Sequence, residues 1–329
     1  QAAALASVAV PGRVVDVLVG PAGAGKTAAM NAPRRAWETE HGAGSVVGLA
    51  PSAVAAQVLA DDLRIATENT AKWWTTHQHT GVTFKAGQLV IIDEASLAET
   101  LSLNRITLAA EEAGTKVLLV GDYAQLPSVD AGGAFSLLIH DRHDAPELVD
   151  VHRFVNTWEK TASLDLRHGR TRVIDTYLAH DRVSDGDAED MIDAAYTAWR
   201  ADRDAGRASV LIAETHEDVT ALNGRARADL ILNKTLNPDR EVELRDGTAA
   251  GVGDTIITRL NNRNLRTLAG RDWVRNGDRW QVTALGADGA LTAQHLDTGR
   301  LITLPADYVA DNTTLGYAST IHAAQGMTA

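Results

Sequence analysis

The feature that most constrains this chain is the stretch at residues 14–27, which has the sequence VVDVLVGPAGAGKT. Its first part is an apolar run rich in β-branched residues, which suits a buried strand and stops at Gly20. A glycine-rich turn follows and ends in Lys26 and Thr27, directly before residues that favour a helix. The order of strand, G-x-x-x-x-G-K-[ST] and helix predicts a phosphate-binding loop. Glycine lets successive backbone N–H groups point inward at an anion, and the helix start adds its unpaired N–H groups.

The residues of this loop have separate expected roles. Lys26 can reach the β- and γ-phosphates of a nucleotide, and the Thr27 hydroxyl can hold Mg²⁺. We therefore expect ATP and Mg²⁺ as cofactors. A flexible surface loop is the ordinary alternative, and the preceding strand argues against it. The remaining members of the cradle are Gly20, Pro21, Ala22, Gly23, Ala24 and Gly25.

Composition limits what the chain can be. With 329 residues it is long enough for about two domains, and a hydrophobic content of 45% suffices for ordinary packed cores. No apolar run reaches about 18 residues, so we expect no membrane segment. The lack of cysteine excludes disulfides and thiolate metal sites, and it agrees with the cytoplasmic location that we expect. A formal charge of −12 argues mildly against coating nucleic acid but allows a narrow basic groove.

The first half of the chain alternates between buried strands and helices. Four apolar runs, at residues 14–19, 45–50, 89–92 and 116–120, are separated by helical patterns. Continuous apolar strands in such an order predict a parallel sheet that is covered on both faces. Three of these strands end in a motif of polar and glycine residues, so we expect the motifs to meet at the carboxyl edge of the sheet. We assign residues 1–150 to this first domain.

The second half predicts another α/β domain with an insertion. Strand and helix patterns restart near residue 150 and occupy residues 151–239 and 311–329. Between them, residues 240–310 form short alternating segments broken by Gly, Asn and Asp. This spacing predicts a small antiparallel β-barrel inserted into the second domain. The predicted fold class is therefore α/β, a P-loop nucleotide-binding protein with two parallel-sheet domains and one inserted barrel.

Four polar side chains outside the loop point to catalysis. Asp93 and Glu94 follow the third apolar strand, where the first carboxylate can hold Mg²⁺ and the second can polarise water. The alternative is that these two acidic residues only stabilise the start of a helix. The phosphate loop earlier in the chain makes this alternative the weaker one. Gln125 can donate to a γ-phosphate, unless it belongs to a plain turn. Arg153 opens the second domain and can face the nucleotide from there, although a lone arginine is more often a surface charge.

These residues together resemble a known family. The ordered motifs GPAGAGKT, IIDEAS, GDYAQLPS, HRF and STIHAAQGMT resemble those of superfamily 1 helicases of the RecD-like branch. The longer stretches HRFVNTWEKTASLDLRHG and LGYASTIHAAQGMT are most similar to the helicase part of conjugative relaxases of the TraI/TrwC type. The resemblance covers nearly the whole chain. It implies two RecA-like domains with an SH3-like barrel in the second.

The resemblance also implies an activity. The expected function is ATP-dependent translocation on single-stranded DNA or unwinding of DNA, in the 5′ to 3′ direction, for plasmid mobilisation. Conjugation proteins of the relaxosome are the partners that it implies besides single-stranded DNA.

Roles carried over from the family fall on individual residues. Gln1 lies where the family has a glutamine that reads adenine, and Gly326 lies in the last motif, near the nucleotide. Gln125 and Arg153 become γ-phosphate sensors. Two further motifs are expected to contact DNA, and their residues here are Pro51, Ser52, His322 and Thr328.

Two departures from the family pattern qualify these expectations. The chain stops just after QGMT, before the motif that supplies a second arginine, so we expect that it turns over ATP poorly. A module that binds nucleotide and DNA without significant turnover is therefore the alternative function. The short stretch before Asp93 leaves room only for a short strand-separating pin. A small-molecule phosphotransferase would explain the phosphate loop but not the second domain.

Overall fold

The computed structural model describes residues 12–126, 131–142, 144–270 and 272–325. The chain divides into two compact units, Gln1–Val183 and Ser184–Ala329. This division falls later than the expected domain boundary at residue 150, because residues 151–183 stay with the first unit. Within the described residues, no helix is both long enough and apolar enough to cross a membrane.

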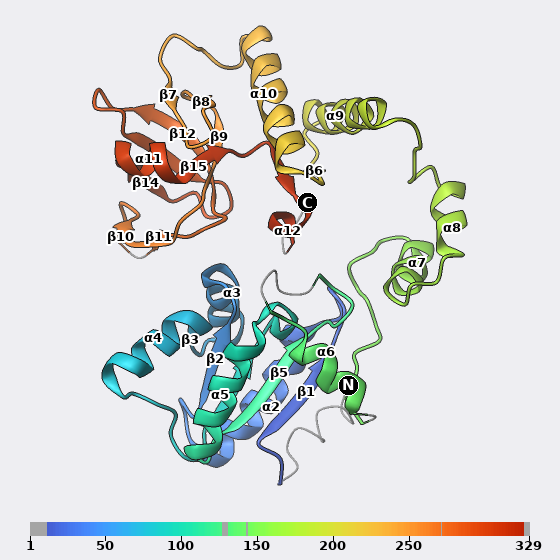
Figure 1. The fold of residues 1–329 in the computed structure, drawn as a ribbon, viewed down its shortest axis with the longest axis vertical. Helices are drawn as coiled ribbons and strands as arrows, with labels where there is room; N and C mark the ends of the chain where they lie inside the picture. Colours follow the sequence, from blue (N-terminus) through green and yellow to red (C-terminus); the bar gives the residue numbers. More distant parts are fainter. Residues whose placement is uncertain (1–11, 127–130, 143, 271, 326–329) are drawn as a thin grey trace. The chain divides into compact units, whose positions relative to one another are not determined.

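The first unit is built on a parallel sheet, as predicted (Figure 1). Its five strands within the described residues have the order β1-β5-β4-β2-β3, and every neighbouring pair is parallel. The four predicted apolar strands all form, whereas β3 was not predicted because its sequence, ATEN, carries no apolar pattern. The strands are β1 (Val15–Val19), β2 (Val46–Ala50), β3 (Ala66–Asn69), β4 (Leu89–Ile92) and β5 (Lys116–Gly121).

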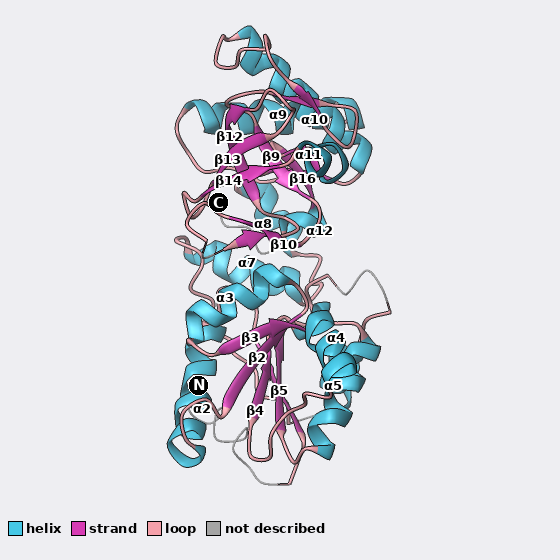
Figure 2. Cartoon of the chain, turned by 90° about the vertical axis from the view of Figure 1, so that its left-hand side faces the viewer, coloured by secondary structure: helices cyan, strands magenta, loops and turns pink. Residues whose placement is uncertain are grey.

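Helices cover both faces of this sheet. Successive strand residues point to opposite faces, so Val17 and Val19 join a cluster with α5 and α6 while Leu18 joins a cluster with α2 and α3. Figure 2 shows α2 and α3 on one side of the sheet and α4 and α5 on the other. This layered parallel sheet is RecA-like. The helices of the unit are α2 (Lys26–His41), α3 (Ala53–Leu63), α4 (Thr70–Thr80), η1 (Ala95–Leu97), α5 (Thr100–Glu112), α6 (Ala134–Asp141), α7 (Thr157–Arg167) and α8 (Val173–Ala179).

The second unit contains the predicted barrel. Its main sheet is antiparallel with the order β14-β13-β12-β9-β15, and two short pairs, β7-β8 and β10-β11, accompany it. The strand β15 lies wholly beyond the predicted end of the barrel at residue 310, yet it pairs with β9 of the barrel. The strands are β7 (Val242–Glu243), β8 (Ala249–Ala250), β9 (Thr255–Thr258), β10 (Asn262–Arg266), β11 (Trp273–Val274), β12 (Arg279–Leu285), β13 (Leu291–His295), β14 (Leu301–Leu304) and β15 (Thr313–Leu315).

The barrel interrupts a parallel α/β element, as predicted. The strands β6 (Leu211–Ala213) and β16 (Ala318–Thr320) pair in parallel, although the whole barrel sequence lies between them. One hydrophobic cluster joins the two parts, with Trp199 and Leu222 from the helices and Trp280 and Leu291 from the barrel. The helices of the unit are α9 (Ala188–Asp204), α10 (His216–Leu232), α11 (Ala306–Asn312) and α12 (Ile321–Ala324).

A buried polar network also ties α10, the barrel and β16 together. The Asn223 Oδ1 atom accepts hydrogen bonds from the backbone N–H groups of Tyr317 and Ala318, both at 2.8 Å. The Tyr317 hydroxyl donates to Asp254 Oδ1 at 2.6 Å, and Arg227 Nε donates to Asp254 Oδ2 at 3.0 Å. Asn223 and Asp254 are almost fully buried, so these bonds form away from solvent. The network fixes the strand that leads into the last sequence motif.

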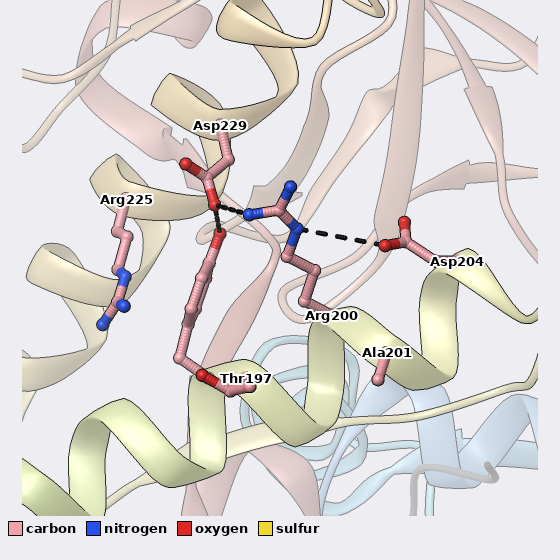
Figure 3. Close-up of a pocket in the computed structure, with 7 residues that line it drawn as sticks. Thr197, Arg200, Ala201, Asp204, Arg225 and Asp229 are labelled. Carbon is pink, nitrogen blue, oxygen red and sulfur yellow. Dashed lines mark hydrogen bonds and ion pairs between the residues drawn. The ribbon is translucent and has the colours of Figure 1, made fainter.

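A charge-balanced pocket lies between α9 and α10 (Figure 3). Asp229 Oδ2 accepts hydrogen bonds from the Tyr196 hydroxyl at 2.6 Å and from Arg200 Nη1 at 2.7 Å. Arg200 also pairs with Asp204 at 3.9 Å, and Arg225 pairs with Asp193. Because carboxylates match the arginines here, we assign the pocket to the packing of α9 against α10 rather than to anion binding.

Candidate nucleotide-binding site

The glycine-rich loop forms the predicted tight turn between β1 and α2. The N–H of Gly20 donates to the Gly121 carbonyl at 3.0 Å, which anchors the loop on β5. Gly23 and Gly25 have φ values of 80° and 77°, in the left-handed region that favours glycine. A Cβ atom on Gly20 would lie 3.0 Å from the Lys26 Cγ atom, so the loop passes close to its own lysine. The backbone therefore has the shape that a phosphate cradle requires.

The other predicted loop residues close this turn. The Ala24 N–H donates to the Pro21 carbonyl at 3.1 Å, and both residues are buried. Ala22 lies half-buried between them. The binding roles of these loop residues stay predictions.

The lysine of the loop meets the acidic motif that follows β4. Lys26 is the first residue of α2, and its Nζ lies 3.5 Å from Glu94 Oε1. The Glu94 Oε2 atom is buried and accepts no hydrogen bond from the residues that the structure describes. Glu94 also has a φ of 50°, a strained conformation that is typical of functional sites. The structure thus brings together two residues that lie far apart in the sequence, as the motif analysis predicted.

Asp93 is half-buried beside this pair. The Glu94 backbone N–H donates to Asp93 Oδ1 at 2.9 Å. Burial, and then the charge of Glu94, raise the pKa of Asp93 to about 6, so its anion is poorly stabilised by the protein alone. A cation beside this carboxylate would relieve that penalty. This partly buried carboxylate is one of the hard oxygen donors that Mg²⁺ prefers.

The hydroxyl of Thr27 lies in the same acidic surroundings. Thr27 Oγ1 donates to Asp62 Oδ2 at 3.0 Å, and the charge of Asp62 contributes to the raised pKa of Asp93. Thr27 and Asp62 are thus in direct contact, and the charge of Asp62 acts on Asp93. The sequence analysis missed Asp62, because an acidic residue near the end of α3 carries no local signal of a site.

Gln125 lies in a turn after β5, at the same carboxyl edge of the sheet. The Gln125 N–H donates to the Asp122 carbonyl at 3.2 Å, and the Ala124 N–H donates to Asp122 Oδ1 at 3.1 Å. Asp122 is buried, whereas Gln125 is half-buried. The turn therefore depends on the Asp122 side chain, and it presents Gln125 from the strand next to β1.

Arg153 lies against the phosphate loop, within the first unit. The segment before it follows the end of β1, where the Val19 N–H donates to the Pro146 carbonyl at 2.9 Å. The His152 N–H then donates to the Gly23 carbonyl at 2.9 Å, and a Cβ on Gly23 would lie 2.7 Å from the Arg153 Cβ. We expected Arg153 to come from the second domain. These hydrogen bonds instead hold it in the same unit as the loop, with its side chain exposed.

The expected DNA-contacting residues have separate positions. Pro51 and Ser52 follow β2 at the carboxyl edge, and Ser52 Oγ accepts the Ala55 N–H at 3.0 Å as the N-cap of α3. His322 is exposed on α12, in the second unit. Their DNA contacts stay predictions. The expected roles of three further residues concern positions outside the described ones, namely Gln1, Gly326 and Thr328.

Family models match both units of the chain. A model described as an AAA domain matches residues 1–188, which is more than half of the chain. The chain belongs to this AAA domain family. A model described as the Rv2311 SH3-like barrel domain matches residues 242–314 of the same AAA-domain chain. The predicted SH3-like character of the insertion is therefore confirmed.

Individual relatives place this AAA-domain chain more narrowly. It is 31% identical over 320 residues to a probable conjugal transfer protein TraA of Sinorhizobium fredii, which covers 95% of the chain and 28% of TraA. Among solved structures, the Pif1 helicase of Candida albicans matches with a TM-score of 0.57 and 16% identity, over 96% of the chain and 83% of the helicase. A Pif1 helicase from Bacteroides, solved with ADP-AlF3 and ssDNA, matches with a TM-score of 0.51 and 18% identity, over 96% of the chain and 81% of the helicase.

These matches confirm the resemblance stated from the motifs. The AAA-domain chain is similar in sequence to a conjugal transfer protein and in fold to Pif1 helicases. The Pif1 likenesses, at low identity, show the fold alone. The chain spans 28% of the length of the Sinorhizobium TraA protein, so the activity and partners of such a whole protein are proposals for this chain.

Proposed function

We propose that this chain is an ATP-driven motor that translocates on single-stranded DNA or unwinds DNA. One observation carries the proposal, the approach of Lys26 Nζ to Glu94 Oε1 at 3.5 Å beside the phosphate loop. A phosphate loop alone supports only nucleotide binding. A carboxylate held next to the loop lysine supports hydrolysis, because it can take a proton from an attacking water.

The side chains divide the chemistry among them. The Lys26 ammonium would turn from Glu94 toward the γ-phosphate, which carries more negative charge than one carboxylate. Glu94, with its buried Oε2 free of hydrogen bonds from the described residues, would then accept the water proton. Gln125 and Arg153 would sense the γ-phosphate. Gln125 follows β5, and Arg153 follows the segment of Glu147, and both segments pair with β1. Arginine suits this role because it stays charged at all physiological pH values.

Thr27 and Asp93 would hold Mg²⁺. When bound, the ion would neutralise negative charge on the phosphate oxygens. The raised pKa of Asp93 fits this role, because the protein alone does not compensate the negative charge of this carboxylate. Asp62 accepts a hydrogen bond from the Thr27 hydroxyl in this structure. On binding of Mg²⁺ it would release this hydroxyl or contact the ion through a water molecule.

The finer parts of the proposal come from the relatives. The TraA likeness supports action in conjugal transfer. We propose relaxosome proteins as partners and the cytoplasm as the location. Single-stranded DNA would cross the carboxyl edge at Pro51 and Ser52 and would contact His322 in the second unit. We propose the 5′ to 3′ direction of movement for this motor.

An ATP hydrolysis assay with and without single-stranded DNA tests the proposal. We expect DNA to stimulate hydrolysis several-fold, and Glu94→Gln to lower turnover by about 10²–10⁴-fold while ATP binding persists. Glu99→Gln is the matched control, because Glu99 is exposed and its side chain makes no cap hydrogen bond at the start of α5. Hydrolysis that DNA does not stimulate, or that survives Glu94→Gln, would contradict the motor.

The direction of movement has its own assay. A streptavidin block at the 3′ end of an oligonucleotide should be displaced in the presence of ATP, and a block at the 5′ end should remain. Displacement from the 5′ end alone would reverse the proposed direction. ATP binding without any turnover in the wild-type chain would instead identify a nucleotide- and DNA-binding module.

A further inference from the structure

Arg167, at the end of α7, is a buried arginine that the motif analysis did not single out. Its side chain is only 7% exposed. Nε donates to Asp122 Oδ1 at 3.0 Å, and Nη1 donates to Glu147 Oε1 at 2.6 Å. The guanidinium also lies over the Tyr123 ring, 4.7 Å from the ring centroid. An arginine that is desolvated and held by two carboxylates and a ring has a fixed orientation.

The two carboxylates belong to different segments, and each segment carries one of the proposed γ-phosphate sensors. Asp122 holds the turn that presents Gln125, through the N–H groups of Ala124 and Gln125. Glu147 forms a parallel bridge with Val19 at the end of β1. The chain continues from Glu147 to Arg153, beside the phosphate loop. One guanidinium therefore joins the bases of both sensor segments.

The charge of Arg167 does not change in the physiological range. Desolvation lowers the pKa of its guanidinium, but the charges of Asp122 and Glu147 outweigh this effect and leave the pKa above its ordinary value. Lysine could replace the charge but not the planar arrangement of N–H donors of the guanidinium. An ammonium group is a point charge without fixed donor directions. The geometry, rather than the charge alone, is therefore what the arginine supplies.

We propose that Arg167 is a positioning residue that sets Gln125 and Arg153 at the correct distance from the γ-phosphate. This inference rests on the proposed function, because it takes the two sensors as given. Arg167 itself does not contact the nucleotide in this scheme. Its removal should therefore weaken the binding of a triphosphate and leave the binding of ADP unchanged, since ADP has no γ-phosphate to sense.

Nucleotide affinities measured on the whole chain test this inference without requiring turnover. The probes are ADP and the non-hydrolysable β,γ-imido analogue of ATP, with Mg²⁺ present. We expect the wild type to bind the analogue more tightly than ADP. Arg167→Ala should lower this preference about tenfold or more, because small misplacements of a positioned group have large effects. The affinity for ADP should stay within about twofold, which a general loss of structure would not allow.

Two further variants separate positioning from folding. Arg170→Ala is the matched control, because Arg170 is exposed and its side chain pairs with nearby Asp165, away from both sensor segments. It should leave the preference unchanged. Arg167→Lys keeps the charge in place, so it remains informative where Arg167→Ala fails to fold, and it should lose part of the preference. In a Gln125→Ala background, Arg167→Ala should add less than it does alone, because both variants disable the same sensor.

The outcomes distinguish the two proposals. A wild type that prefers the triphosphate, with the same preference in Arg167→Ala or in folded Arg167→Lys, would overturn the role of Arg167 and leave the motor intact. Equal losses for ADP and the analogue would also overturn it, since they would show general damage. A wild type with no preference at all would overturn the sensors themselves, and with them both proposals.

Discussion

Asn223 offers a sharp test of how the second unit is held together. Its side chain is 1% exposed on α10, and its Oδ1 atom accepts two backbone N–H groups, those of Tyr317 and Ala318, each at 2.8 Å. Asn223→Ala removes the acceptor and leaves both donors buried at the start of β16. The alanine side chain offers them nothing in return.

The size of the effect follows from this count of donors. A buried donor that loses its partner costs about 1–3 kcal/mol, so two such donors cost about 2–6 kcal/mol of unfolding free energy. This is a large fraction of the stability of an ordinary domain, which is about 5–15 kcal/mol. We therefore expect β16 to open in the variant well before the rest of the molecule unfolds.

Hydrogen exchange on peptides that contain residues 316–321 measures this opening directly, and urea unfolding measures the total loss. Asn233→Ala is the matched control, because Asn233 caps the same helix but is exposed and should change the stability by no more than about 0.5 kcal/mol. Equal exchange and equal stability in the two variants would refute the reasoning. They would mean that the two N–H groups find other acceptors at no cost.

Two further predictions follow from the backbone and from burial. Gly23 and Gly44 both have a φ of 80°, but only at Gly23 would a Cβ meet another residue, the Cβ of Arg153 at 2.7 Å. Gly23→Ala should therefore lose about 1–3 kcal/mol more unfolding free energy in urea than Gly44→Ala, and equal losses would show that Arg153 yields freely. Burial raises the pKa of Tyr308 to about 12. The folded state thus keeps this proton above pH 10, where the unfolded tyrosine loses it, so the stabilisation is complete below about pH 10 and is lost between about pH 10 and 12. Thermal unfolding of Tyr308→Phe across that range should decline less steeply than that of the wild type, and parallel declines would contradict the assigned pKa.

Much of the site was predictable because its signals are local. An apolar strand, glycines at fixed spacing and the lysine and threonine that follow together predict the phosphate loop. All of these features lie within residues 14–27. Asp93 and Glu94 directly follow another apolar run, so their place at the carboxyl edge could be derived. The edge strand β3 could not be found this way. Its polar sequence forms a strand only because β2 offers a partner.

Other parts of the molecule depend on contacts that no local pattern records. Arg167 acts on Asp122, 45 residues earlier, and Asn223 acts on Tyr317, 94 residues later. An arginine at a helix end and an asparagine within a helix are both common on surfaces, so neither stands out in a sequence. Arg153 was assigned to the second domain because helix and strand patterns restart near it. A hydrogen bond between the segment that carries Arg153 and the phosphate loop instead holds this residue in the first unit.

The inserted barrel has a consequence for how the second unit folds. Leu211 of β6 pairs with Ala318 of β16, and the closure of so long a loop would ordinarily be slow and would lose much chain entropy. The barrel reduces this difficulty, because the first and last strands of its five-stranded sheet, β9 and β15, pair with each other and shorten the loop that must be closed. Once the hairpins of the barrel have formed, β16 is already beside the position where β6 will bind. The short parallel pair of β6 and β16 can therefore tolerate a long insertion between its strands. We expect the barrel to fold first and the pair to form afterwards.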